Sequence, residues 1–421
     1  MLFILLGATR GSAIPAAIEQ EADRFVLRRE GASLFLRGAV APDRFELLRA
    51  SGANAVRTNA TRANLDAAHR AGLVVLANLP VRGERDGLDW DNPRHLAEQQ
   101  ERVLAVVRDL KDHPGVVIWA LGNELDWIPP GRPHHPHLWR RLNDLARAVK
   151  AADPDHPVLT VLGDSTFERK IQELARDAPD FDLLGLNAYG ALASLAELTR
   201  KYWPKPYIVS EWGPTGHWEV PQTDWRAPLE QTSSEKAAVI EQRYREVIRA
   251  DPARCLGSFV FYWSEKQETT HTWYGLFHQG LRTESIDVMQ RLWTGAWPGN
   301  RAPRIEGFAL RGHPNPRAIV LKPGENGQAE VRAIDPDDDP LSYVWEIRPE
   351  VEIPADSYAG RGEKRAEPIP GLIADATTPQ PRLVAPSQPG AYRLFVSVTD
   401  GQDHSAYANL PFLVAAPGDS P

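Results

Sequence analysis

Eight short apolar runs alternate with amphipathic helical stretches between residues 25 and 295, and no other feature limits the fold of this chain as strongly. Most of the runs are continuously apolar, as in strands buried on both faces of a parallel sheet. They predict strands at 34–38, 54–58, 73–78, 116–121, 158–162, 182–187, 206–211 and 257–263. Several helical stretches between them end in glycine or stop before proline. The repeats therefore favour an α/β fold of the (β/α)8 TIM-barrel type.

The alternative is a doubly wound sheet, which a glycine-rich phosphate turn after the first strand would favour. No such turn is present in the sequence. We therefore predict a TIM barrel over residues 24–296.

The composition of the sequence changes at TGAWPGNRAPR, which is rich in proline and glycine. Residues 297–304 are therefore predicted to be a linker. Helical periodicity stops after it. Segments such as LSYVWEI and YRLFVSVTD are rich in β-branched and aromatic residues and are separated by turn residues. Residues 305–421 are therefore predicted to form a small all-β sandwich, which resembles polycystic-kidney-disease-type or cadherin-like modules.

The first residues, MLFILLGATRGSA, are apolar and then small, as in the core and cleavage site of a secretory signal, although the basic leading region is missing. We interpret residues 1–23 as a signal or an N-terminal extension and expect a periplasmic or secreted protein. The alternatives are a short buried strand or a misplaced start, with a cytoplasmic protein. We expect no membrane span, because no apolar run is long enough.

Charge and cysteine content exclude several classes of protein. Forty-eight Lys and Arg against 56 Asp and Glu give a formal charge of −8, so a nucleic-acid partner is not expected. The single cysteine, Cys255, excludes an intramolecular disulfide and any cluster of cysteine ligands.

Two further motifs bear on metals. His134, His135 and His137 lie in the proline-rich PPGRPHHPH, which suggests no fixed ligand geometry, so we predict no metal there. The acidic DPDDDP at 335–340 does not have the spacing of an EF-hand loop. We interpret it as a solvated turn, with a calcium site as the alternative.

Active sites of such barrels lie at the carboxyl ends of the strands. The polar or aromatic residues predicted there are Arg57, Asn123, Glu124, Asn187, Tyr189, Glu211 and Trp263. Glu124 and Glu211 are separated by roughly 90 residues, the span of three strand–helix steps of about 30 residues. Two carboxylates at one rim are what glycoside cleavage needs, because one protonates the leaving oxygen and the other attacks or stabilises the sugar cation.

These segments resemble the catalytic barrel of retaining glycoside hydrolases of clan A, most closely that of glycoside hydrolase family 2. The matching segments are FLRGAV, SGANAVRTN, HPGVVIWALGNELD, FDLLGLNAYG, YIVSEWG, and GSFVFYWSE with WYGLF. The likeness extends over residues 25–295. These segments in this order are a specific signal for the family, although the Asn-Glu pair alone would be weak evidence.

The resemblance implies a role for each matched residue. Glu211 is the nucleophile that attacks the anomeric carbon, and Glu124 is the acid/base, with the two carboxyls about 5–5.5 Å apart. Arg57 and Tyr189 donate to Glu211, and Asn123 bonds to a sugar 2-hydroxyl. Neither a metal nor an organic cofactor is expected.

Substrate contacts are also expected from aromatic and polar residues of the rim, some of which could instead pin long loops to the barrel. They are Asn187, Trp212, Trp263, Trp127, Trp218, His271 and Trp273.

The sequence departs from the family in two respects. Few residues precede the first strand, and the histidine usual near the third strand is not evident in LANLPVRGER. Both departures favour a groove for a longer chain. We therefore predict a retaining hydrolase of a β-linked oligo- or polysaccharide. The alternatives are a transglycosylase with the same residues and a non-catalytic carbohydrate-binding barrel.

Overall fold

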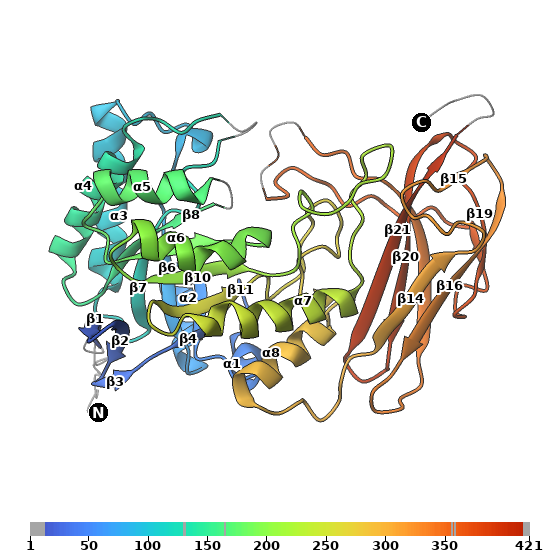
Figure 1. The fold of residues 1–421 in the computed structure, drawn as a ribbon, viewed down its shortest axis with the longest axis horizontal. Helices are drawn as coiled ribbons and strands as arrows, with labels where there is room; N and C mark the ends of the chain where they lie inside the picture. Colours follow the sequence, from blue (N-terminus) through green and yellow to red (C-terminus); the bar gives the residue numbers. More distant parts are fainter. Residues whose placement is uncertain (1–12, 129–131, 164–165, 355–356, 358, 416–421) are drawn as a thin grey trace, which may run out of the picture. The chain divides into compact units, whose positions relative to one another are not determined.

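The computed structural model describes residues 13–128, 132–163, 166–354, 357 and 359–415. It divides the chain into two compact units (Figure 1). The barrel unit contains the described residues up to Trp212 and Val247–Val260, and the second unit contains Gly213–Glu246 and the described residues from Phe261. Residues 1–12 of the predicted signal lie outside the described residues.

The barrel unit contains eight parallel strands that close on themselves in the order β10-β11-β4-β5-β6-β7-β8-β9. The strands are β4 (Leu36–Val40), β5 (Ala55–Asn59), β6 (Val74–Leu79), β7 (Val116–Leu121), β8 (Val158–Leu162), β9 (Leu183–Asn187), β10 (Tyr207–Trp212) and β11 (Cys255–Val260). The helices that follow strands in this unit are α1 (Phe45–Ala50), α2 (Arg62–Arg70), α3 (Pro93–Leu110), α4 (Leu138–Ala152), α5 (Phe167–Asp177) and α6 (Leu195–Tyr202). The predicted (β/α)8 barrel is confirmed.

Continuous burial explains why the strands could be found from the sequence. All six residues of β7, VVIWAL, are buried, and so are all five of β8 and of β9. Each predicted strand overlaps an observed one. The last prediction, 257–263, extends too far, because β11 ends at Val260.

A small antiparallel sheet precedes the barrel and was not predicted. It is formed by β1 (Ala16–Glu21), β2 (Arg24–Arg29) and β3 (Ala32–Ser33). Ala16 and Leu27 belong to the apolar cluster of the barrel interior. Arg29 donates from Nη1 to the carbonyl of Val116 at 2.8 Å, at the amino end of β7. The sheet therefore packs at the end of the barrel opposite to the strand ends that carry the predicted site.

The second unit joins two helices to an all-β region. The helices are α7 (Ser233–Glu246) and α8 (Glu284–Thr294), and a short ribbon pairs β12 (Phe277–His278) with β13 (Leu281–Arg282). The all-β region has two four-stranded sheets, β14-β16-β19-β18 and β15-β21-β20-β17. Their strands are β14 (Arg304–Leu310), β15 (Val320–Leu321), β16 (Asn326–Ile334), β17 (Ser342–Pro349), β18 (Ile373–Ala374), β19 (Arg382–Val384), β20 (Gly390–Thr399) and β21 (Ser405–Val414).

One apolar core joins the two sheets of this region. Val331 and Leu383 enter it from one sheet, and Trp345, Leu394 and Phe412 from the other. Burial on the inner faces is what makes two sheets a sandwich. Its likeness to a particular family of modules stays a prediction, and so does the linker at 297–304. Among the helices that the structure describes, none has both the length and the hydropathy needed to cross a bilayer.

Candidate active site

Glu124 is placed by the sharp end of β7. Gly122 has φ of 76° and Glu124 has φ of 48°, so the chain turns through the left-handed region directly after the strand. A residue with a Cβ adopts that region at a cost of about 1–3 kcal/mol, and such residues gather at functional sites. The Glu124 amide is held by the carbonyl of Val161 in β8, at 3.0 Å.

Glu211 is placed by an irregularity in β10. The pairing of β10 with β9 shifts register between Val209 and Glu211. A bulge of this kind redirects a side chain that regular alternation would point elsewhere. The Glu211 side chain is 14% exposed, so it is mostly removed from solvent but still accessible.

Asn187, the last residue of β9, brings the two glutamates together. Its Nδ2 donates to Glu124 Oε1 at 2.7 Å and lies 3.3 Å from Glu211 Oε2. Because both oxygens contact one nitrogen, they can be at most about 6 Å apart, the sum of the two distances. This is below the range of about 6.5–9.5 Å that inverting enzymes need to fit a water molecule.

Arg57, at 2% side-chain exposure, is the charged centre beneath the carboxylates. Its Nη2 donates to Asn123 Oδ1 at 2.6 Å, and its Nη1 donates to Asn187 Oδ1 at 3.2 Å. Nη1 also lies 3.6 Å from Glu211 Oε2, an ion pair that favours the charged form of that carboxylate. The guanidinium thus holds both asparagines by their carbonyl oxygens, so their amide nitrogens point to other partners.

Tyr189 completes the contacts of Glu211. Its hydroxyl donates to Glu211 Oε1 at 2.8 Å. A hydrogen bond to a charged acceptor is stronger than one between neutral groups. The structure therefore brings together Arg57, Asn123, Glu124, Asn187, Tyr189 and Glu211.

Sequence reasoning missed residues that support the loop after β7. Arg85, in the short helix η1 (Glu84–Asp86), donates to the carbonyls of Asn123 and Trp127 at 2.5 and 3.1 Å. It belongs to RGERD, in the region where the family's usual histidine was missing. Charge alone does not distinguish this arginine from others in the sequence.

A second support lies beneath Glu124. A Cβ added to Gly163 would stand 3.1 Å from both Cγ and Cδ of Glu124, so the glycine leaves room for that side chain. Lys170 of α5 pairs with Asp126 at 2.5 Å and donates to the Gly163 carbonyl at 3.3 Å. This buried ion pair ties the loop after β7 to the loop after β8.

The predicted aromatic contacts are mostly buried. Trp212 and Trp263 are 0% exposed, and Trp273 is 1% exposed. Trp263 packs against Phe277 and Trp293. These three rings have no open face for a sugar, so the expected stacking gains no support from their exposure.

Exposure is different at Trp127 and Trp218. Trp127 is half-buried in the barrel unit. Trp218, in the second unit, is 50% exposed, and its ring meets His217 edge-on at 4.9 Å. His217 Nε2 in turn lies 3.6 Å from Glu268. Trp218 with His217 is therefore the most open aromatic surface among the predicted residues.

His271 packs beside a strand of the sandwich, and its predicted contact with substrate stays a prediction. Its ring lies 4.7 Å from Phe395 of β20 and stacks on His278. Burial, with nearby cationic groups, lowers the pKa of His271 to about 2. The side chain is therefore an uncharged part of the packing on the sandwich strand.

The acidic turn of the sandwich binds its own backbone. Asp335 Oδ1 accepts from the amides of Asp337 and Asp339 at 2.8 and 3.1 Å. Asp335 and Asp339 also approach Asp400, with one oxygen of each within 4.8 Å of the others. The turn is therefore ordered by internal hydrogen bonds, and calcium stays an alternative.

Residues 39–218 match the model of glycosyl hydrolases family 2, TIM barrel domain. This range contains all six residues that the structure brings together around Glu124 and Glu211. The β-glucuronidase of Pongo abelii is 30% identical over 189 residues, and that of Paenibacillus borealis is 28% identical over 194. Each match covers 40% of this chain but only 27% and 30% of the relative. The chain therefore aligns with less than a third of the length of these curated relatives.

Solved structures extend the likeness in fold. β-Glucuronidase 3 of Bacteroides uniformis superposes with a TM-score of 0.50 at 16% identity, over 95% of this chain and 52% of that one. β-Glucuronidase 2 of the same organism, solved covalently bound to cyclophellitol-6-carboxylate aziridine, gives 0.51 at 15% identity, over 95% and 48%. At these identities the likeness concerns the fold alone.

Proposed function

We propose that this protein is a retaining β-glycoside hydrolase, with Glu211 as nucleophile and Glu124 as acid/base. The observation that carries the proposal is the contact of one amide nitrogen, Asn187 Nδ2, with both carboxylates. Two carboxylates at that spacing, on the carboxyl ends of barrel strands, are the machinery of double displacement. The match to the family 2 barrel over the same residues supports it.

In the first step a Glu211 oxygen attacks the anomeric carbon while Glu124 protonates the departing oxygen. Arg57 and Tyr189 keep Glu211 ionised and fix its direction, through the 3.6 Å ion pair and the 2.8 Å hydrogen bond. Attack consumes the charge of Glu211 and forms an ester bond to the sugar. The proton that leaves Glu124 goes to the leaving group, so Glu124 ends this step as a carboxylate.

In the second step Glu124 takes a proton from water, which attacks the anomeric carbon and releases Glu211. Two inversions restore the original configuration. Asn123 offers its Nδ2 to the sugar 2-hydroxyl, because its Oδ1 accepts from Arg57 and Asn187. That hydrogen bond strengthens as charge develops on the sugar.

The substrate is a β-linked glycoside. The curated relatives are named β-glucuronidases, so a β-glucuronide heads the substrates to test, together with oligo- and polysaccharides. Water and a sugar hydroxyl compete for the same intermediate, so product analysis separates hydrolysis from transfer.

A substrate screen followed by proton NMR tests the proposal. Aryl β-glucuronide, β-galactoside, β-mannoside and β-glucoside, together with β-glucans, mannans and galactans, are incubated with the protein. We expect the first product of the cleaved substrate to be the β-anomer. A first product with inverted configuration would reject double displacement even if cleavage occurs.

A covalent probe tests the nucleophile directly. A cyclophellitol aziridine that matches the cleaved sugar should add one inhibitor mass to the protein, on the peptide that contains Glu211. The Glu211→Gln variant should not be labelled. Glu197→Gln, which changes an exposed glutamate of α6, is the matched control and should be labelled as the unmodified protein is. A label on any other carboxylate contradicts the assignment.

A further inference from the structure

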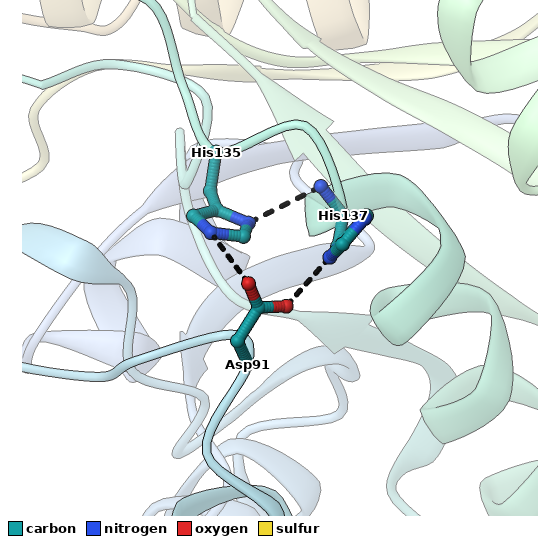
Figure 2. A group of neighbouring side chains, drawn as sticks. All are labelled: Asp91, His135 and His137. Atoms are coloured by element: carbon teal, nitrogen blue, oxygen red, sulfur yellow. Dashed lines mark hydrogen bonds and ion pairs between the residues drawn. The ribbon is translucent and has the colours of Figure 1, made fainter.

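Two loops of the barrel unit bring an aspartate and two histidines together (Figure 2). Asp91 lies in the segment between η1 and α3, which follows β6. His135 and His137 lie before α4, in the segment that follows β7 and begins with Asn123 and Glu124. The three residues are thus held together by the fold and not by their spacing in the sequence.

The carboxylate of Asp91 lies between the two imidazoles. His137 Nδ1 lies 2.6 Å from Asp91 Oδ1, and His135 Nε2 lies 3.5 Å from Asp91 Oδ2. The ring centroids of the two histidines are 5.3 Å apart, and the ring planes are inclined at 65°. One ligand atom of each residue lies within 4.8 Å of the others. His137 and His135 both lower the pKa of Asp91, chiefly through the hydrogen bond from His137.

The loops that carry these ligands are fixed by other contacts. The amide of His135 donates to Glu84 Oε2 at 2.8 Å, and the amide of Asp91 donates to Asp89 Oδ1 at 2.9 Å. Arg141 is a nearby positive charge that opposes a cation, and Glu84, which accepts from the amide of His135, is a negative charge that favours one. The side chains of Asp91 and His137 are 55% and 45% exposed, so solvent weakens both effects.

We propose that Asp91, His135 and His137 form a binding site for one divalent transition-metal ion of the zinc class. Two imidazoles and a carboxylate are ligands that zinc prefers, and the exposed side leaves a position for water. Ligand atoms about 2.0–2.1 Å from a tetrahedral zinc ion stand roughly 3.4 Å apart. The 3.5 Å contact already has this length, and the 2.6 Å contact has to widen by about 0.8 Å.

Binding requires a proton to leave the ligand nitrogen of each imidazole, because His137 Nδ1 donates to Asp91 and His135 Nε2 also carries a proton. His135 Nδ1 accepts from the amide of His137 at 3.2 Å, which places the ring proton on Nε2, the atom that faces Asp91. When Nε2 binds the ion, that proton moves to Nδ1, which can then no longer accept from the amide of His137. Because the ion binds imidazole only in its neutral form, metal binding competes with protons and weakens as pH falls.

The ion would cross-link the loop after β6 to the loop after β7. Arg85 joins the same two loops through the carbonyls of Asn123 and Trp127. The site is thus a second connection between them, on the segment that also carries Glu124. Its existence does not depend on the proposed hydrolase activity.

Calorimetric titration of the full chain with zinc chloride at pH 7.5, after treatment with EDTA and gel filtration, tests the proposal. We expect one zinc ion per chain, with zinc also raising the melting temperature. Asp91→Asn, His135→Gln and His137→Gln should each weaken zinc binding at least tenfold. His313→Gln removes a histidine of the second unit, outside the cluster, and should bind zinc as the unmodified protein does.

Repeating the titration at pH 5.5 adds a readout that folding defects would not mimic. Zinc affinity should fall markedly between pH 7.5 and pH 5.5 while the metal-free protein remains folded by circular dichroism. Absence of zinc binding by the unmodified protein, or equal binding by the cluster variants and His313→Gln, would overturn the proposal.

Discussion

Two groups of residues, one around Glu230 and one around Glu124 and Glu211, hold carboxylates that have little exposure to solvent. We call them carboxylate centres, and they differ in how the surrounding charges and hydrogen-bond donors match the carboxylates. In the second unit, Glu230 is 0% exposed; its Oε1 accepts from Lys236, and its Oε2 accepts from Thr270 and Asn409 at 2.6 Å each. Burial alone would raise the pKa of Glu230, but the charge of Lys236 and these hydrogen bonds outweigh it, and the pKa is lowered. This centre is closed, because its charge is matched inside the protein.

The centre in the barrel unit is open. Glu124 and Glu211 contact the same amide nitrogen of Asn187, Glu211 also pairs with Arg57, and Glu211 keeps a solvent-accessible surface. Two carboxylates held this close disfavour each other's charged form, and a purely structural network has no reason to keep such a pair. The comparison teaches that burial of a charge does not mark function. Two like charges brought together at an accessible surface are a better indication of function.

The largest expected effect is on the open centre. Glu211→Gln should lower kcat/KM by at least about 10⁴-fold, because the proposed attacking oxygen is lost. The melting temperature should not fall, since the change removes one of two neighbouring like charges. Steady-state kinetics and thermal melts check both. Full activity, or loss of the fold, would remove the distinction between the two centres.

The opposite pattern is expected at the closed centre. Glu230→Ala leaves Lys236 buried without its carboxylate and should destabilise the protein by about 3–5 kcal/mol. Urea denaturation measures the loss. Glu98→Ala, which removes the exposed partner of Arg94, should leave the midpoint unchanged. If the two variants are equally stable, the Glu230 pair is not the structural element that its burial suggests.

Acid should destabilise the unit that contains the closed centre. Burial lowers the pKa of His271 to about 2 and that of His278 to about 4, whereas an exposed histidine titrates near 6.5. The unfolded chain therefore takes up protons first as pH falls. Stability is fully present above about pH 6.5 and decreases below it, by about 1.4 kcal/mol per pH unit for each imidazole.

Urea denaturation at pH 7, 6 and 5 checks this dependence. His271→Phe should make it shallower, and His313→Gln should not change it. The unfolding free energy could instead change equally with pH in the unmodified protein, His271→Phe and His313→Gln. That result would show that His271 takes up protons as readily as an exposed histidine does.

A smaller effect is expected from the hydrogen bond to the proposed nucleophile. Tyr189→Phe should lower kcat by about 10–100-fold, because hydrogen bonds to charged groups contribute about 1.5–3 kcal/mol. Tyr202→Phe, which removes a surface hydroxyl bonded to Glu168, is the control and should keep full activity. The pH profile of kcat/KM should shift only in Tyr189→Phe, a change that general loosening would not produce.

The smallest effect is expected at Gly163. Gly163→Ala places a methyl group 3.1 Å from the carboxyl carbon of Glu124 and should lower kcat about tenfold by displacing that group. Gly299→Ala, where the methyl group meets nothing within 4 Å, should be neutral. Equal activity of the two variants would show that the Glu124 side chain tolerates displacement.

The sequence predicted the barrel strands closely because strands buried on both faces leave continuous apolar runs, as in VVIWAL. It also placed Glu124 and Glu211 at strand ends, since barrel topology brings those ends together. The small sheet β1–β3 was missed because its strands are short and partly exposed.

The supporting contacts of the centre could not be predicted. Arg85 and Gly163 act across loops, and nothing in the one-dimensional pattern shows which loop meets which. For the same reason Asp91 was not associated with His135 and His137, since more than forty residues separate them in the chain. Rings such as Trp263 were expected to meet a sugar, but large apolar rings also complete cores, and burial cannot be read from residue type.

The side chain of Arg57 has a consequence for anyone who redesigns this protein. Its three nitrogens donate to Asn78, Asn123 and Asn187, and Nη1 also donates to the Ser210 carbonyl at 3.0 Å, so one planar group joins β5 to four neighbouring segments. A lysine could not replace it, because a single ammonium nitrogen does not reach in so many directions. Loop grafting to alter selectivity should therefore start outside this guanidinium, whose replacement would disperse the whole cluster at once.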